Sequence, residues 1–135
     1  MRVVVAPVDD FPPGTRRIVT VGNREIGVFR VGEQFYALRN RCPHQGGALC
    51  LGGILPRVIS DKPGVVAYDD GPPLVICPWH GWQFDASTGE AFAPGDPRVR
   101  SFDVSVESGR DISGTVSFAE TFPVHVEDDY VLLET

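Results

Sequence analysis

At 135 residues, the chain is long enough for one compact domain, residues 1–135, and too short for two ordinary ones. Its formal net charge is −6 and its Lys and Arg residues form no run, which argues against nucleic acid or an anionic membrane as a partner. The acidic balance would suit docking onto a basic patch of a partner protein, or it would serve solubility alone.

The chain starts with a short apolar stretch. Within Met1–Asp10 this stretch is far shorter than the h-region of a signal peptide, and acidic residues follow it at once. No run approaches the roughly 18 apolar residues that a transmembrane helix requires. We therefore expect a soluble, cytoplasmic protein.

The rest of the sequence predicts an all-β fold. Short runs of Val, Ile, Phe and Tyr recur between Gly, Pro and Asp breaks, and no stretch keeps a helical period over three turns. Hairpin turns are expected at Gly22-Asn23, Gly32-Glu33 and Asp128-Asp129, and an extra hairpin is expected around Ser108–Ser117. The predicted strands, in chain order, are Thr15–Val21, Glu25–Val31, Gln34–Arg39, Val65–Ala67, Leu74–Ile76, Trp82–Phe84, Arg100–Glu107, Thr115–Glu127 with a break, and Tyr130–Glu134.

Two short elements, Cys42-Pro43-His44 and Cys77-Pro78-Trp79-His80, each place one thiol beside one imidazole. A structural zinc site normally groups like ligands in Cys-x2-Cys and His-x3-His pairs, whereas here each element is mixed. The spacing suits two metal ions side by side, with the thiols on one and the imidazoles on the other. A [2Fe–2S] centre with two Cys on one iron and two His on its neighbour has this ligand set.

Longer segments around these elements resemble the Rieske iron–sulfur family. The segments similar to its first loop, its second loop and the hairpin before loop one are Arg41–Leu49, Val75–Asp85 with Ser87-Thr88-Gly89, and Glu25–Val31 with Gln34–Asn40. The match is continuous from about Pro7 to Pro97 apart from one insertion. The resemblance implies a Rieske-like fold, with an antiparallel β-sandwich or barrel as its base and a small cluster-binding subdomain, about residues 40–97, inserted into it.

The resemblance also implies one [2Fe–2S] cluster per chain. Cys42 and Cys77 would bind the inner iron as thiolates, and His44 and His80 would bind the outer iron. Two ferric ions, two sulfides and two thiolates carry no net charge, whereas four thiolates would leave a dianion. Adding an electron to the neutral centre costs less, so the reduction potential is expected in the range of about −150 to +300 mV, above that of plant-type ferredoxins.

Residues around the ligands place the expected potential at the low end of that range. High-potential relatives carry a second Cys in each loop, and here Gly47 and Trp79 occupy those positions, so the clamping disulfide is absent. Those relatives also place Ser and Tyr hydroxyls near the second loop, where this chain has Trp82 and Phe84. Neither side chain offers a hydroxyl to the cluster.

Three further features have both an ordinary and a functional interpretation. Cys50 is expected to be an inert buried thiol, with reaction or bridging under oxidation as the alternative. Trp79 is the better candidate for the exposed tip, and Ala93-Pro94-Gly95 resembles the family's proline-rich third loop. The interval from Gln45 to Ile76 is about twice the usual one, and its surplus, about residues 56–73, is either a hairpin that shapes partner choice or a neutral surface insertion.

The resemblance implies an electron carrier that passes one electron from a reductase to an oxygenase, and not an enzyme in its own right. A Rieske oxygenase adds a mononuclear iron held by two His and a carboxylate, and His125 alone cannot supply that triad. A small subunit of a larger reductase or oxygenase complex, a structural zinc module and a redox sensor are the alternatives. A monomer is expected, and the sequence identifies neither the reductase, the oxygenase nor the final substrate.

Overall fold

A computed structural model describes residues 1–59, 62–112, 116–120 and 122–135. The chain divides into two compact units, which we name the base unit, Met1–Leu38 with Phe102–Thr135, and the loop unit, Arg39–Ser101. Strands make up nearly all regular structure, and the described ranges contain two short 3-10 helices, η1 (Val8–Asp10) and η2 (Leu49–Leu51), and no α-helix. The prediction of an all-β fold is confirmed. No helix in these ranges is long and apolar enough to cross a membrane.

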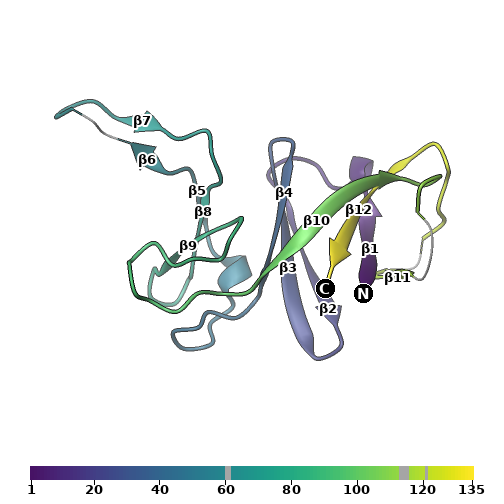
Figure 1. The fold of residues 1–135 in the computed structure, drawn as a ribbon, viewed down its shortest axis with the longest axis horizontal. Helices are drawn as coiled ribbons and strands as arrows, with labels where there is room; N and C mark the ends of the chain where they lie inside the picture. The colour runs from purple at the N-terminus through teal and green to yellow at the C-terminus, as the bar shows by residue number, and fades with distance from the viewer. Residues whose placement is uncertain (60–61, 113–115, 121) are drawn as a thin grey trace. The chain divides into compact units, whose positions relative to one another are not determined.

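The base unit is built on a curled seven-stranded sheet with the order β11-β1-β12-β10-β4-β3-β2 (Figure 1). Its strands are β1 (Arg2–Pro7), β2 (Arg16–Val21), β3 (Arg24–Val31), β4 (Gln34–Arg39), β10 (Ser101–Ser108), β11 (Val116–Phe118) and β12 (Asp129–Glu134). The turns predicted at Gly22-Asn23 and Gly32-Glu33 are confirmed, whereas the turn before β12 lies at Val126-Glu127, so Asp129 already belongs to the strand.

Strand β1 was not predicted from the sequence, because its residues do not alternate between apolar and polar. Val3 and Val5 pack into one hydrophobic core, while Val4 packs on the opposite face against Tyr130 and Leu132. A strand that is buried on both faces has a continuous apolar run in place of a period of two. The three consecutive valines of β1 therefore reflect its position between β11 and β12.

The C-terminal segment covers the second face of this sheet and differs from the prediction. Within the predicted range Thr115–Glu127, the described residues form a strand only at β11, and Thr115 and Thr121 lie outside those residues. β11 pairs in parallel with β1 and does not neighbour β10, so the hairpin expected around Ser108–Ser117 is wrong. Phe122 instead stacks on Tyr130, with ring centroids 6.0 Å apart, because the apolar face of β1 and β12 needs a cover.

The loop unit contains two small antiparallel sheets. The first has the order β5-β8-β9, formed by Ile54–Leu55, Leu74–Ile76 and Gln83–Asp85. The second pairs β6 (Val58–Ile59) with β7 (Ala67–Tyr68) inside the surplus of residues 56–73, and Figure 1 shows these two strands as one hairpin. The strand expected at Val65–Ala67 is therefore shifted toward Tyr68, because its register is set by pairing with Val58, which the sequence did not mark as a strand.

Candidate metal centre

The two predicted ligand loops form the same backbone turn. In the first, the Cys42 N–H donates to the Gly47 carbonyl (2.8 Å) and the Gly46 N–H to the Cys42 carbonyl (2.7 Å). In the second, the Cys77 N–H donates to the Trp82 carbonyl (2.8 Å) and the Gly81 N–H to the Cys77 carbonyl (3.0 Å).

Each turn ends on a glycine in the left-handed region, with φ of 76° at Gly46 and 74° at Gly81, where a side chain would be strained. The histidine stands at the third position of the first turn, at His44, and at the fourth position of the second, at His80. Equal turns therefore present their thiols in equivalent positions while they place their imidazoles differently.

The thiols of Cys42 and Cys77 lie together and are buried, with exposed fractions of 2% each. Burial raises the pKa of the Cys42 thiol, and the neighbouring Cys77 thiol acts in the same direction, whereas the backbone N–H groups of His44 and Gln45 that point at its sulfur act in the opposite direction. A thiolate at this position would therefore rest in a cradle of N–H donors, which is the environment that a metal-bound sulfur requires.

The imidazoles of His44 and His80 lie next to each other on the exposed side of the loops. Their ring centroids are 5.1 Å apart with an interplanar angle of 80°, and both residues are exposed. The indole of Trp82 stacks on the His44 ring at 4.1 Å and 13°, which restricts the orientation of that ring. The site therefore separates into a buried pair of sulfur atoms and an exposed pair of imidazoles.

Gly47 and Trp79 bring the two loops into contact. A Cβ on Gly47 would lie 3.0 Å from the Trp79 ring and 3.2 Å from the Cys77 sulfur, so only a glycine fits there without displacing a neighbour. These are the positions of the clamping disulfide in high-potential relatives, and a glycine–indole contact replaces it here. Trp79 is 59% exposed and Cys50 is fully buried, as predicted, and all three cysteines are free thiols.

The residues present fit a two-iron cluster better than one metal ion. Across the described ranges, no three His, Cys, Asp or Glu side chains converge on a point that would hold a single ion, whereas a structural zinc site needs four such ligands. A [2Fe–2S] cluster asks only two protein ligands of each iron, and the structure provides one pair of each kind. The donor set and the N–H cradle agree with that group.

An ion pair joins the surplus segment to the strand that follows the second loop. The Arg57 guanidinium lies 2.6 Å from the Asp85 carboxylate, which also accepts hydrogen bonds from the N–H groups of Ser87 (2.8 Å) and Thr88 (3.0 Å). Burial raises the pKa of Asp85, but the hydrogen bonds from Ser87 and Arg57 outweigh that effect and lower the pKa below its usual 3.8.

Asp85→Asn is expected to lower the free energy of unfolding at pH 7 by about 2 kcal/mol, because hydrogen bonds to a charged group are lost. Since the pKa of Asp85 is lowered by folding, its contribution is fully present above about pH 4 and is lost as the pH falls through the folded value. The difference between wild type and variant should therefore shrink in strong acid. Urea unfolding followed by circular dichroism at several pH values measures this, with exposed Asp70→Asn as control; a difference that does not change with pH would contradict it.

The excess of acidic residues is divided unequally between the two units. The loop unit holds six basic and six acidic residues, so the whole excess of six acidic residues belongs to the base unit. Of the residues next to the predicted ligands, Arg41 is basic and none is acidic. The loop unit therefore has no net negative charge that would make it an acidic docking surface.

Comparison with known proteins decides the family. Residues 1–103 match the Rieske [2Fe-2S] domain. The chain belongs to the Rieske family. A Rieske domain of this kind holds a single [2Fe–2S] cluster.

Rieske relatives of similar length are similar over most of this chain. The ferredoxin component of the alkene monooxygenase system of Xanthobacter autotrophicus is 31% identical over 84% of this chain and 80% of that protein. The solved ferredoxin of carbazole 1,9a-dioxygenase from Nocardioides aromaticivorans is 26% identical, with a TM-score of 0.62, over 97% of this chain and 96% of that one. A ferredoxin solved in complex with the oxygenase of carbazole 1,9a-dioxygenase is 28% identical, with a TM-score of 0.59, over 95% and 98%.

Sequence reasoning missed several residues of this Rieske site. The stacking of Trp82 on His44 and the Arg57–Asp85 ion pair join positions 38 and 28 residues apart, and no local pattern marks such pairs. The equivalence of the two turns had a signal, because Cys-Pro is followed by glycine at the fifth position in both loops.

Proposed function

We propose that this chain is a one-electron carrier in which Cys42 and Cys77 bind one iron and His44 and His80 bind the other. It receives electrons from a reductase and delivers them to a terminal oxygenase, in the cytoplasm. When bound, the cluster supplies a reversible one-electron couple. The residues of the chain bury its sulfur side, orient the imidazoles and leave the imidazole side accessible to a partner protein.

The observation that carries this proposal is the arrangement of the two equal turns. They place two thiols together in the interior and two imidazoles together at the surface, which is the ligand set of one [2Fe–2S] cluster with mixed ligation. The relatives support the partner class, since they include ferredoxin components of oxygenase systems and a ferredoxin solved together with its oxygenase.

The surroundings of the ligands support a potential at the low end of the range of about −150 to +300 mV. Trp82, which is stacked on His44, and Phe84, which is fully buried, occupy the positions of the hydroxyl donors in high-potential relatives. Neither side chain carries a hydroxyl. The loops also lack the clamping disulfide.

A potentiometric titration followed by EPR tests the cluster. We expect the oxidised protein to be silent and the reduced protein to give one signal, with an average g value below that of all-Cys clusters, and with a midpoint potential at the low end of that range. Silence in both states, together with zinc and no iron in anaerobically prepared protein, would contradict the electron-carrier function.

Reconstitution tests the direction of transfer. The chain should be reduced by a reductase of its source organism and should then support turnover by a Rieske-type oxygenase of the same organism. A chain that carries the cluster but supports no oxygenase would leave an electron carrier with a different acceptor.

A further inference from the structure

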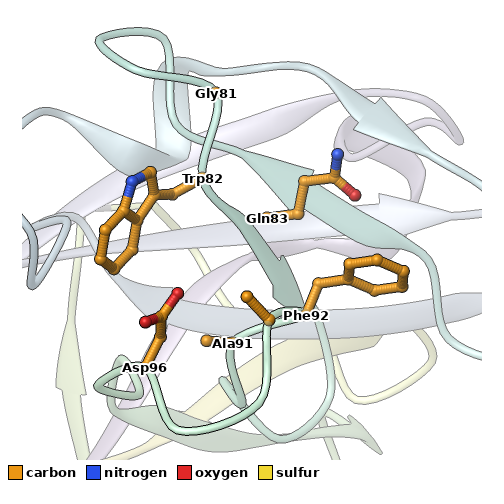
Figure 2. A pocket seen from close by; sticks show the side chains of 7 residues that line it. Gly81, Trp82, Gln83, Ala91, Phe92 and Asp96 are labelled. Carbon is orange, nitrogen blue, oxygen red and sulfur yellow. The ribbon is translucent and has the colours of Figure 1, made fainter.

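A hollow of about 250 Å³ lies beside the second ligand loop and is open to solvent. All of its walls belong to the loop unit. Figure 2 shows Trp82 and Asp96 on one side of it and Gln83 and Phe92 on the other. The residues that line it are Gly81, Trp82, Gln83, Ala91, Phe92, Ala93 and Asp96.

Trp82 connects this hollow to the candidate centre. Its indole stacks on the His44 ring at 4.1 Å and also forms a wall of the hollow. Phe92, a second aromatic wall, is 59% exposed. A group that enters the hollow therefore lies one aromatic ring away from an expected ligand of the cluster.

The hollow holds one carboxylate, at Asp96, and one side-chain amide, at Gln83, and none of the residues that line it is a cation. The Asp96 carboxylate projects toward the Trp82 ring (Figure 2), and within the described part of the chain its side chain forms no hydrogen bond or ion pair. Arg98, two residues further on, donates instead to the Thr88 carbonyl at 2.7 Å. Gln83 adds an amide on the far side of the hollow.

We propose that this hollow receives an arginine side chain of the oxygenase to which the chain delivers its electron, a proposal that rests on the proposed function. A carboxylate beside an indole ring fits a planar guanidinium, which can stack on the ring and donate two hydrogen bonds to the carboxylate. Residues 41–49 and 75–84 carry no acidic residue and the loop unit has no net charge, so Asp96 supplies the negative charge of the hollow that selects a cation.

The chemistry of the hollow is tested first, without any partner. We would place 4-fluorophenylalanine at position 92 of the cluster-loaded protein and follow its fluorine resonance during titration with N-acetyl-arginine amide. A saturable shift is expected, weakened roughly fivefold or more by Asp96→Asn and absent with the neutral citrulline analogue. Equal shifts from the arginine and citrulline compounds, or no saturable shift in the millimolar range, would overturn the proposal.

The role in docking is tested with the oxygenase that wild-type protein supports. Asp96→Asn is expected to raise the KM for the reduced carrier roughly fivefold and to reduce its dependence on salt, with kcat, midpoint potential and EPR signal unchanged. Asp103→Asn is the control for net charge, because Asp103 is an exposed carboxylate of the base unit that forms no ion pair with the described residues. Identical KM values for Asp96→Asn and Asp103→Asn would overturn the docking role. A wild-type protein that supports no oxygenase would count against the proposed function. In that case the arginine titration still decides the chemistry of the hollow.

Discussion

Cys77→Ala is expected to abolish cluster binding, whereas Cys50→Ala is expected to retain it. Both thiols are buried, so the two substitutions remove a similar volume from the loop unit. Cys77 lies beside the Cys42 thiol, and the proposed ligand set needs two neighbouring thiolates for one iron. The iron content of the purified protein should fall from about two per chain to nearly none in Cys77→Ala, with loss of visible absorbance.

Cys50→Ala is the control for the loss of a buried thiol that is not a predicted ligand. Cys50→Ala should cost about 1 kcal/mol of stability, because a small cavity forms at a buried site, and should leave the reduced EPR signal unchanged. Far-UV circular dichroism establishes whether each variant still forms its strands. Retention of iron in a folded Cys77→Ala protein, or its loss only in Cys50→Ala, would show that the ligands are assigned wrongly.

Gly52→Ala is expected to destabilise the protein by about 3 kcal/mol or more, whereas the adjacent Gly53→Ala is expected to change stability by less than about 1 kcal/mol. A Cβ on Gly52 would lie 1.6 Å from the carbonyl oxygen of Ile76, which is backbone and cannot rotate away, while a Cβ on Gly53 would meet nothing within 4 Å. Urea unfolding at constant pH measures both values.

The same substitution should also affect the cluster. The Ile76 N–H donates to the Gly53 carbonyl at 2.9 Å, and Cys77 follows Ile76 directly, so a displacement of β8 would move this proposed ligand. We therefore expect Gly52→Ala, but not Gly53→Ala, to lower the iron content. Equal urea concentrations at the unfolding midpoint and equal iron contents for the two variants would contradict the close approach of the Gly52 backbone to the Ile76 carbonyl.

The charge distribution limits which groups near the candidate centre a partner protein could recognise. The excess of acidic residues belongs to the base unit. The loop unit, which contains His44 and His80, therefore offers a partner protein no net charge to recognise. Recognition there would depend on the exposed Trp79, on the imidazole edges and on single charges such as Asp96. Sensitivity to salt should accordingly be modest, since few charges are involved.

The sequence by itself determined the family, the all-β class and the four candidate ligands, because each depends on local information. Proline, glycine and other turn residues interrupt the apolar runs of this sequence and so limit it to short strands. Cys42 and His44 are close enough in sequence to lie in one loop, and so are Cys77 and His80. The absence of a second cysteine in each loop, at Gly47 and Trp79, is likewise a fact of the sequence alone.

Only the tertiary structure decided which residues meet across the chain. The three valines of β1 carry no alternating signal because both faces are buried, and β11 extends the sheet by pairing in parallel with β1, a partner far away in the sequence. The stacking of Trp82 on His44, the ion pair of Arg57 with Asp85 and the hollow at Asp96 each bring together residues separated in sequence. Such contacts result from packing between elements, and packing follows no period that can be read along one segment.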